Sequence, residues 1–290
     1  MKLPFNIDLT NKVVVITGGT GVLGSSMSTA LAQSGAKVAM VGIADDNNGL
    51  VDQIKALGGE SKVFLGDVTK KADMERVKKE VNEAFGSVDI LINGAGGNSP
   101  KGTTDDERFE GQLDQEGKTF FDLDEKSVGF VMDLNFLGTF IPSQVFATDM
   151  LDKEEASIIN ISSMNAFTPL TKIPGYSGAK AAISNFTQWL SVYFSKTNIR
   201  VNAIAPGFLL TKQNEALLLN EDGSYTDRSR KIINATPMER FGKPEELIGA
   251  LLFLVSEEAS SFINGVVLPI DGGFNAYSGC LLYTSDAADE

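Results

Sequence analysis

A serine, a tyrosine and a lysine in the second half of the chain have the spacing of an acid–base site. Ser163 stands 13 residues before Tyr176, and Lys180 follows Tyr176 by four. In a helix, a spacing of four places Tyr176 and Lys180 on one face, one turn apart. A tyrosine hydroxyl has an ordinary pKa of about 10, and a neighbouring ammonium lowers it. The pattern predicts that Tyr176 exchanges a proton and that Ser163 hydrogen-bonds a carbonyl or alcohol oxygen.

Other residue types limit the alternatives. The chain contains no histidine and one cysteine, Cys280. These counts exclude Ser-His-Asp and Cys-His catalysis, histidine metal sites and an intramolecular disulfide. We therefore expect no metal. Acid–base chemistry near neutral pH falls to a carboxylate, a lysine or an activated tyrosine. Because a tyrosine and a lysine four apart are also common on helix surfaces, the assignment depends on the rest of the chain.

Composition indicates a globular protein with a substantial core. The 290 residues are 42% hydrophobic and 22% charged, and the net charge of −13 argues against a nucleic-acid or anionic-membrane surface. The opening MKLPFNIDLTNK lacks the apolar stretch of a secretion signal, and no apolar run is long enough to span a membrane. We expect a cytoplasmic protein without a nucleic-acid or membrane partner.

The C-terminal tail differs in character from the rest. Residues 280–290, CLLYTSDAADE, resemble the translated read-through of a sequencing adapter. We interpret them as a non-native tail, with a natural helical or disordered tail as the alternative. Removing them also removes three acids, Asp286, Asp289 and Glu290, and leaves a net charge of −10. A single domain is expected to cover residues 1–279.

Short β-branched runs alternate with amphipathic helical patterns. This alternation is typical of an α/β fold with a doubly wound parallel sheet and helices on both faces. The predicted strands are Val13–Thr17, Lys37–Val41, Lys62–Leu65, Ile90–Asn93, Ser157–Ile161, Val201–Ala205 and Val266–Ile270. The predicted helices are Ser25–Gln33, Leu50–Leu57, Lys71–Phe85, Lys126–Met150, Tyr176–Lys196 and Pro244–Val255.

Two long stretches, Gly97–Asp124 and Phe208–Thr236, break this alternation and are read as irregular. Each follows a strand at the carboxyl edge of the sheet, where such sheets bind ligands. A glycine-rich turn, TGGTGVLG at residues 17–24, joins the first strand to the first helix. Its glycines allow backbone N–H groups and the helix N-terminus to approach a pyrophosphate. The turn therefore predicts a dinucleotide site.

Together these motifs resemble the short-chain dehydrogenase/reductase family over about residues 8–275. The family's TGxxxGxG appears as Thr17, Gly18 and Gly24, although Val22 stands at the middle glycine, one place after Gly21. The resemblance implies a single Rossmann-type sheet of about seven strands in the order 3-2-1-4-5-6-7. Further matches are Asp67-Val68, Asn93-Gly94-Ala95-Gly96, Asn135, Ser163 with Tyr176 and Lys180, and Pro206-Gly207 with Thr211.

The resemblance also implies the roles of these residues. The catalytic tetrad is Asn135, Ser163, Tyr176 and Lys180, in which Lys180 holds the nicotinamide ribose and Asn135 anchors a proton-relay water. Cofactor-binding residues implied in the same way are Gly18, Thr20, Gly21, Val22, Leu23, Gly24, Gly42, Asp67, Val68, Asn93, Gly94, Ala95, Gly96, Tyr176, Lys180, Pro206, Gly207 and Thr211.

The end of the second strand bears on the choice of dinucleotide. Gly42 stands at the usual acidic position and Ile43 at the usual basic position. Asp45 or Asp46 could bind ribose hydroxyls and repel a 2′-phosphate, or could cap a helix. The expected cofactor is NAD(H), with NADP(H) as the alternative.

Four further stretches resemble a sugar-acid branch of the family, the D-mannonate oxidoreductases or fructuronate reductases: GAGGNSPKGTTDDE, FFDLD, SSMNAFTPLTKIP and APGFLLTKQN. The alternatives are a gluconate-type or 2-deoxygluconate dehydrogenase, a 3-oxoacyl-carrier-protein reductase and a non-enzymatic nucleotide-sensing regulator. Ser163 would contact the reacting oxygen. Asn98, Asn165 and Gln213 could bind hydroxyls, and Lys101, or else Lys172 or Lys212, could pair with a carboxylate.

The helix predicted at Tyr176–Lys196 carries a wide apolar surface beyond its Tyr-Lys pair. One face of a sheet cannot cover all of it. The resemblance implies that this helix and Lys126–Met150 pair with the same helices of a second subunit, in a homotetramer or homodimer. The apolar residues are Phe186, Trp189, Leu190, Tyr193 and Phe194.

Overall fold

The computed structural model describes residues 7–46, 49–113, 116–212 and 214–277, so Gln213 and the tail 280–290 lie outside the described residues. Seven parallel strands form one sheet in the order β3-β2-β1-β4-β5-β6-β7, which confirms the predicted fold class. The seven predicted strands are all present, with ends that differ by at most two residues. They are β1 (Val13–Thr17), β2 (Lys37–Gly42), β3 (Glu60–Leu65), β4 (Ile90–Asn93), β5 (Ala156–Ile161), β6 (Ile199–Pro206) and β7 (Val267–Ile270). The expectation of a single domain over 1–279 stays a prediction.

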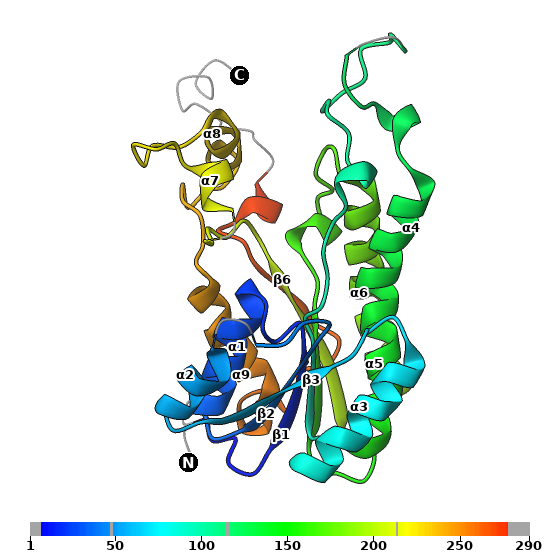
Figure 1. Cartoon of the computed structure of the whole chain (residues 1–290), viewed down its shortest axis with the longest axis vertical. Helices are drawn as coiled ribbons and strands as arrows, with labels where there is room; N and C mark the ends of the chain where they lie inside the picture. The colour runs from blue at the N-terminus through cyan, green and yellow to red at the C-terminus, as the bar shows by residue number, and fades with distance from the viewer. Residues whose placement is uncertain (1–6, 47–48, 114–115, 213, 278–290) are drawn as a thin grey trace, which may run out of the picture.

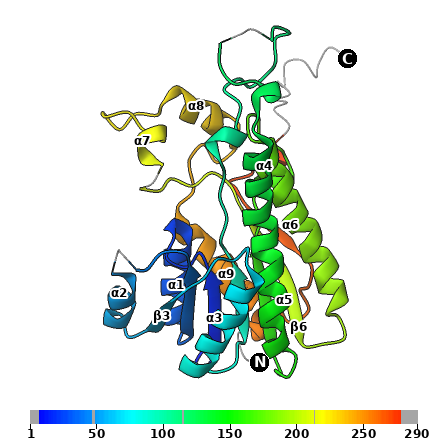
Figure 2. The same cartoon turned by 45° about the vertical axis from the view of Figure 1, so that its right-hand side comes forward.

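Helices cover both faces of the sheet (Figures 1 and 2). Alternate residues of β1 enter the two cores: Val14 and Ile16 pack in one, and Val13 and Val15 in the other. Central strands buried on both faces read as continuous apolar runs, which is why β1 is VVVIT. One face carries α1 (Val22–Gln33), α2 (Leu50–Ala56) and α9 (Ile248–Val255), and the other α3 (Lys71–Ala84), α5 (Gly138–Met150) and α6 (Pro174–Tyr193).

The helix predicted at Lys126–Met150 is interrupted. It consists of α4 (Glu125–Met132), a π-helical turn at Asp133–Leu137 and α5. A single π turn inside a helix inserts a wider loop of backbone and is frequent at functional sites. Here it carries Asn135, whose side chain is fully buried.

The stretch Phe208–Thr236 is not irregular throughout, so that part of the prediction is wrong. It contains α7 (Glu215–Leu218) and α8 (Asp227–Asn234), followed by a 3₁₀ turn, Pro244–Leu247, before α9 and by α10 (Glu257–Ser260) after it. The α7 helix has only four residues and α8 is mostly polar, so no helical period stands out in the sequence. A separate small cluster of Leu218, Ile233 and Phe241 holds them.

In the described residues of the stretch Gly97–Asp124, the only regular elements are two 3₁₀ turns, Pro100–Gly102 and Phe120–Asp122. Figures 1 and 2 place it at the same end of the molecule as α7 and α8. An ion pair of 3.0 Å between Lys231 Nζ and Glu107 Oε1 joins the two stretches directly. The two segments expected to form the ligand site are therefore neighbours in space.

A buried chain of amides fixes the sheet against α5 and α6. Asn93 Nδ2 donates to Ser143 Oγ (2.9 Å) and to Asn160 Oδ1 (2.8 Å), and Asn160 Nδ2 donates to Thr187 Oγ1 (2.9 Å). Because buried polar groups are costly unless paired, this chain favours one register of β4, β5, α5 and α6. None of the helices in the described part of the chain is both long enough and apolar enough to cross a bilayer.

Candidate active site

The carboxyl ends of β1, β4, β5 and β6 open into a cleft of about 370 Å³. Parallel strands point their carboxyl ends to one edge, so residues distant in sequence meet there. The cleft is lined by Val22, Leu23, Gly94, Gly96, Gly97, Ile161, Ser162, Ser163, Tyr176, Lys180, Pro206, Gly207, Phe208, Leu209, Thr211, Asn214, Leu217, Leu218, Arg228 and Ile232.

Ser163, Tyr176 and Lys180 lie together in this cleft, as the spacing predicts. Ser163 follows β5 and begins the 3₁₀ turn Met164–Ala166, where its Oγ accepts a hydrogen bond from Asn165 N (3.3 Å). Tyr176 and Lys180 stand one turn apart on α6, with Lys180 Nζ 5.5 Å from the centroid of the tyrosine ring. Lys180 Nζ donates to the carbonyl of Ile161 at the end of β5 (2.8 Å).

The expectation that Lys180 lowers the pKa of Tyr176 is not met in this structure. Burial is the largest effect and raises the pKa of the Tyr176 hydroxyl, while hydrogen bonding with Ser163 opposes it. Burial likewise lowers the pKa of Lys180 to about 8. Each group loses water around its charged form, and Lys180 does not offset this loss for the tyrosine. Burial therefore favours the neutral form of both side chains in the ligand-free structure.

Asn135 hydrogen-bonds the backbone that follows β4, close to Lys180. Its Nδ2 donates to the carbonyls of Gly97 (2.7 Å) and Val131 (2.8 Å), and its Oδ1 accepts from Gly97 N (3.3 Å). A Cβ added to Gly96 would lie 2.6 Å from Asn135 Oδ1 and 3.4 Å from Lys180 Nζ. Only a glycine therefore lets these groups converge. The structure brings Asn135 to the site and leaves its relay role a prediction.

The glycine-rich turn fits a dinucleotide phosphate. Gly18 has a positive φ of 69°, and a Cβ on Gly24 would overlap the carbonyl of Gly18. Thr17 Oγ1 accepts from Gly94 N and Ala95 N (both 3.1 Å), which ties β1 to the backbone after β4. No described side chain caps α1, and no acid stands in its first turn, so its N–H groups remain available to an anion.

The adenosine side of the predicted cofactor site lies beyond the cleft. Ile43 is 85% exposed next to Gly42. Asp46 caps α2, accepting from Leu50 N (2.9 Å) and Val51 N (2.7 Å), and Asp45 Oδ1 accepts from Asp46 N (2.8 Å). Helix capping, the alternative role, is thus what Asp46 does in the structure.

Asp67, the other residue predicted on that side, is bound within its own turn. Its Oδ1 accepts from Thr69 N (3.0 Å) and Thr69 Oγ1 (2.7 Å), and this bonding lowers the pKa of the Asp67 carboxyl. Val68 is buried against Gly138. A contact of either residue with adenine stays a prediction.

The predicted substrate residues are only partly brought together. Asn98 is exposed and donates to Thr103 Oγ1 (3.1 Å), and Lys101 is exposed on its 3₁₀ turn; neither lines the cleft. Asn165 is buried beside Ser163, and its Oδ1 has no hydrogen-bond partner among the described residues. Gln213 is outside the described residues.

The two alternative lysines do not reach the cleft lining either. Lys172 Nζ donates to the carbonyl of Asp105 (2.7 Å), and Lys212 is exposed. The sequence analysis missed Asn214 and Arg228, which both line the cleft. Arg228 and Ile232 stand four apart and share one face of α8, but the spacing carries no signal while the helix itself is not predicted.

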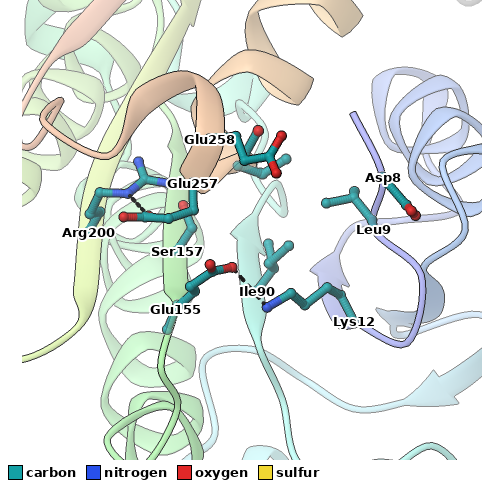
Figure 3. Close-up of a pocket in the computed structure, with 12 residues that line it drawn as sticks. Asp8, Leu9, Lys12, Ile90, Glu155, Ser157, Arg200, Glu257 and Glu258 are labelled. Carbon is teal, nitrogen blue, oxygen red and sulfur yellow. Dashed lines mark hydrogen bonds and ion pairs between the residues drawn. The ribbon is translucent and has the colours of Figure 1, made fainter. Parts of the chain in front are cut away.

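A second cavity, of about 160 Å³, lies at the opposite, amino-terminal edge of the sheet (Figure 3). Four of its charged side chains form two ion pairs: Lys12 with Glu155 (3.2 Å) and Arg200 with Glu257 (2.8 Å). None of the residues predicted to do chemistry lines it. The chemistry therefore points to the carboxyl-edge cleft.

Comparison with known proteins agrees with this geometry. Residues 12–222 match the short chain dehydrogenase family. The chain belongs to this family. A short chain dehydrogenase is an oxidoreductase, so the enzymatic class that the motifs predicted is confirmed.

The chain is similar to three further proteins over almost its whole length. A crystal structure from Haemophilus influenza with bound NAD, described as a proposed D-mannonate oxidoreductase, is 55% identical, with a TM-score of 0.91 over 95% of this chain and 99% of that one. The uncharacterized oxidoreductase UxuB of Bacillus subtilis is 50% identical over 96% of this chain and 99% of its own length. The 2-dehydro-3-deoxy-D-gluconate 5-dehydrogenase of Dickeya dadantii is 31% identical over 93% and 97%.

The burial of Lys180 predicts a pH-dependent stability for this dehydrogenase. Its pKa is about 8 in the fold against an ordinary 10.5, so between these values the unfolded chain holds a proton that the folded chain has lost. Stability from this group therefore rises with pH across that window, by up to about 3 kcal/mol. Lys180→Met removes the effect. Urea unfolding of the ligand-free proteins should show the parent gaining about 2 kcal/mol on the variant between about pH 7.5 and about pH 9.5.

Other titrating groups are common to both proteins and cancel in that comparison. A difference between parent and Lys180→Met that stays constant with pH would show that Lys180 titrates normally and is not desolvated.

Proposed function

We propose that this short chain dehydrogenase interconverts a ketone and a secondary alcohol on a sugar acid, most specifically D-fructuronate and D-mannonate. One observation supports the proposal most strongly: Ser163, Tyr176 and Lys180 line the same cleft as the start of α1, whose N–H groups are free to bind a phosphate. The choice of sugar acid is supported by the 55% identical structure described as a proposed D-mannonate oxidoreductase.

The residues that would hold the cofactor line the cleft or present backbone N–H groups that a phosphate can approach. They are the turn Gly18–Gly24 with the first N–H groups of α1, the segment Gly94–Gly96 after β4, Lys180, and Pro206, Gly207 and Thr211 after β6. When bound, NAD(H) supplies or accepts the hydride. The same α1 terminus is the natural place for its pyrophosphate.

Proton transfer is the task of Tyr176. In reduction, its hydroxyl donates a proton to the oxygen of the carbonyl that becomes an alcohol, and in oxidation it takes that proton back. Ser163, which lines the cleft beside Tyr176, positions the same oxygen. When Tyr176 loses its proton, the Lys180 ammonium stabilises the buried phenolate. The phenolate in turn favours the protonated form of Lys180. Asn135 keeps Gly97, and with it this wall of the cleft, in place.

A gluconate-type dehydrogenase is the second candidate. It is supported by the 31% identity to a 2-dehydro-3-deoxy-D-gluconate 5-dehydrogenase, which acts on a related hexonate. The two candidates share the proton-transfer machinery and differ only in the sugar acid that the cleft accepts.

The test is a substrate panel with Tyr176→Phe as the inactive control. D-fructuronate, D-mannonate, 5-keto-D-gluconate and D-gluconate are assayed with NAD(H) and NADP(H). We expect the highest kcat/KM for D-fructuronate with NADH. Tyr176→Phe keeps the ring and removes the proton, so its turnover should fall by a factor of at least about 100 while NADH still binds. Near-normal turnover in this variant contradicts the mechanism, and a preference for gluconates favours the second candidate.

We propose NAD(H) as the physiological cofactor. Position 43, where enzymes that bind NADP usually carry a basic residue to pair with its 2′-phosphate, is an isoleucine in this chain. Ile43→Arg supplies a guanidinium and should raise kcat/KM for NADPH about tenfold, because charge-assisted bonds to phosphate are strong. Ile43→Gln is the matched control, since it removes the apolar side chain without adding a charge. A parent enzyme that uses NADPH better than NADH would contradict this assignment.

We also propose that the subunits pair through α5 and α6. Trp189 and Tyr193 stack on each other and are 56% and 66% exposed, beside a groove of about 280 Å³ that also includes Phe140. Exposed aromatic surface of this kind is typical of an interface. Light scattering at micromolar concentration should show a dimer or tetramer for the parent and a smaller species for Trp189→Arg. A monomeric parent would contradict the pairing.

A further inference from the structure

The charge of the cleft differs from that of the molecule. The chain carries a net charge of −13. Yet the described residues that line the cleft include two cations, Lys180 and Arg228, and no carboxylate. A cation-only lining in an acidic protein raises the local concentration of an anion and favours its binding. Lys180 is buried and hydrogen-bonded at the chemical centre, which leaves Arg228 to be explained.

Arg228 is held over the cleft by the start of α8. Thr226 caps the helix and accepts a hydrogen bond from Ser229 N (3.3 Å), and Ser229 Oγ donates to the carbonyl of Leu218 (2.6 Å). These bonds fix α8 to the end of α7. Since Ile232 also lines the cleft, the 228–232 face of α8 is the one turned to it.

Four other basic residues of α8 and the facing loops are engaged elsewhere. On the same helix, Arg230 pairs with Asp227 (3.4 Å) and Lys231 with Glu107 (3.0 Å). In the facing loops, Lys172 donates to the carbonyl of Asp105 and Lys118 to that of Pro100 (both 2.7 Å). Arg228 has no hydrogen bond or ion pair with the described residues.

We propose that Arg228 binds the carboxylate of the substrate, an inference that rests on the proposed sugar-acid function. A guanidinium presents a planar pair of N–H donors that matches a carboxylate, and a lysine does not. Phe208, Leu217 and Ile232 line the same cleft, and apolar surface there strengthens such a pair by excluding water. This assignment replaces Lys101, which does not line the cleft.

The geometry suits a hexulosonate. In D-fructuronate the ketone and the carboxylate stand at opposite ends of a row of hydroxylated carbons. Ser163 and Tyr176 lie at the strand ends, whereas Arg228 comes from α8 in the segment after β6. One ligand can therefore meet the proton donor with its ketone and Arg228 with its carboxylate. The cofactor pyrophosphate is the other anion near this cleft, but the uncapped N-terminus of α1 already serves it.

The experiment compares Arg228→Met with Arg228→Lys and with the matched control Arg230→Met, which removes a guanidinium from the same helix. Substrates are D-fructuronate and D-fructose, which carries a hydroxymethyl group in place of the carboxylate. Two binding constants are measured as well: that of NADH by fluorescence, and that of D-mannonate for the NADH-loaded enzyme by calorimetry. Circular dichroism and thermal unfolding confirm that each variant is folded.

We expect Arg228→Met to lower kcat/KM for D-fructuronate by about 10- to 100-fold and to weaken D-mannonate binding by a similar factor. Activity on D-fructose and the affinity for NADH should stay within about twofold of the parent. Arg228→Lys should recover part of the loss, because it keeps the charge and loses the planar pair of donors. Arg230→Met should behave as the parent does.

Three outcomes overturn the inference and are distinguishable. If the parent prefers D-fructuronate and Arg228→Met keeps that preference, the proposed function stands and Arg228 does not bind the carboxylate. If both substrates and NADH lose affinity together, Arg228 serves the cofactor pyrophosphate. If the parent uses none of the sugar acids, the proposed function fails and the inference fails with it.

Discussion

The site depends on one buried lysine. Lys180 lies in the interior between α6 and the end of β5, with the carbonyl of Ile161 as its described hydrogen-bond partner. An ammonium in such a place loses much of its hydration, and its pKa falls to about 8. The group is therefore poised to respond to any negative charge that develops nearby. The adjacent phenol of Tyr176, whose own pKa is raised by burial, is the group that can develop it.

Several neighbouring features allow Lys180 and Tyr176 to lie close together in the cleft. Gly96 must lack a side chain so that Asn135 and Lys180 can approach it, and the π turn within the α4–α5 segment brings Asn135 to that place. Asn93 and Asn160 lock β4 and β5 against the helix that carries the tyrosine and lysine. Beyond the carboxyl ends of the strands, the Lys231–Glu107 ion pair joins α8 to the loop after β4. The predicted proton-transfer residues thus lie on α6 and directly after β5, and the segments after β4 and β6 border the same cleft.

Sequence patterns predicted the sheet well because most of its strands are short, largely apolar runs, and β1, β4, β5 and β6 are buried along their whole length. They predicted the convergence of Ser163, Tyr176 and Lys180 for a similar reason, since helical spacing and parallel strands determine it. They did not predict the π turn, because its residues continue an ordinary helical pattern, or α8, whose stability comes from Leu218 and Phe241 elsewhere in the chain. The direction of the Tyr176 pKa was wrong, because desolvation depends on packing that spacing does not reveal. Arg228 was missed for the same reason as α8.

A crystal structure of the enzyme with NAD and D-mannonate tests the account most directly. The hydroxyl on the reacting carbon should lie at hydrogen-bond distance, about 2.7–2.8 Å, from both Tyr176 Oη and Ser163 Oγ. In addition, the carboxylate of the same molecule should face Arg228. A hydroxyl bound away from Tyr176, with the tyrosine oxygen contacting neither substrate nor cofactor, would contradict the assignment of Tyr176 as the proton donor.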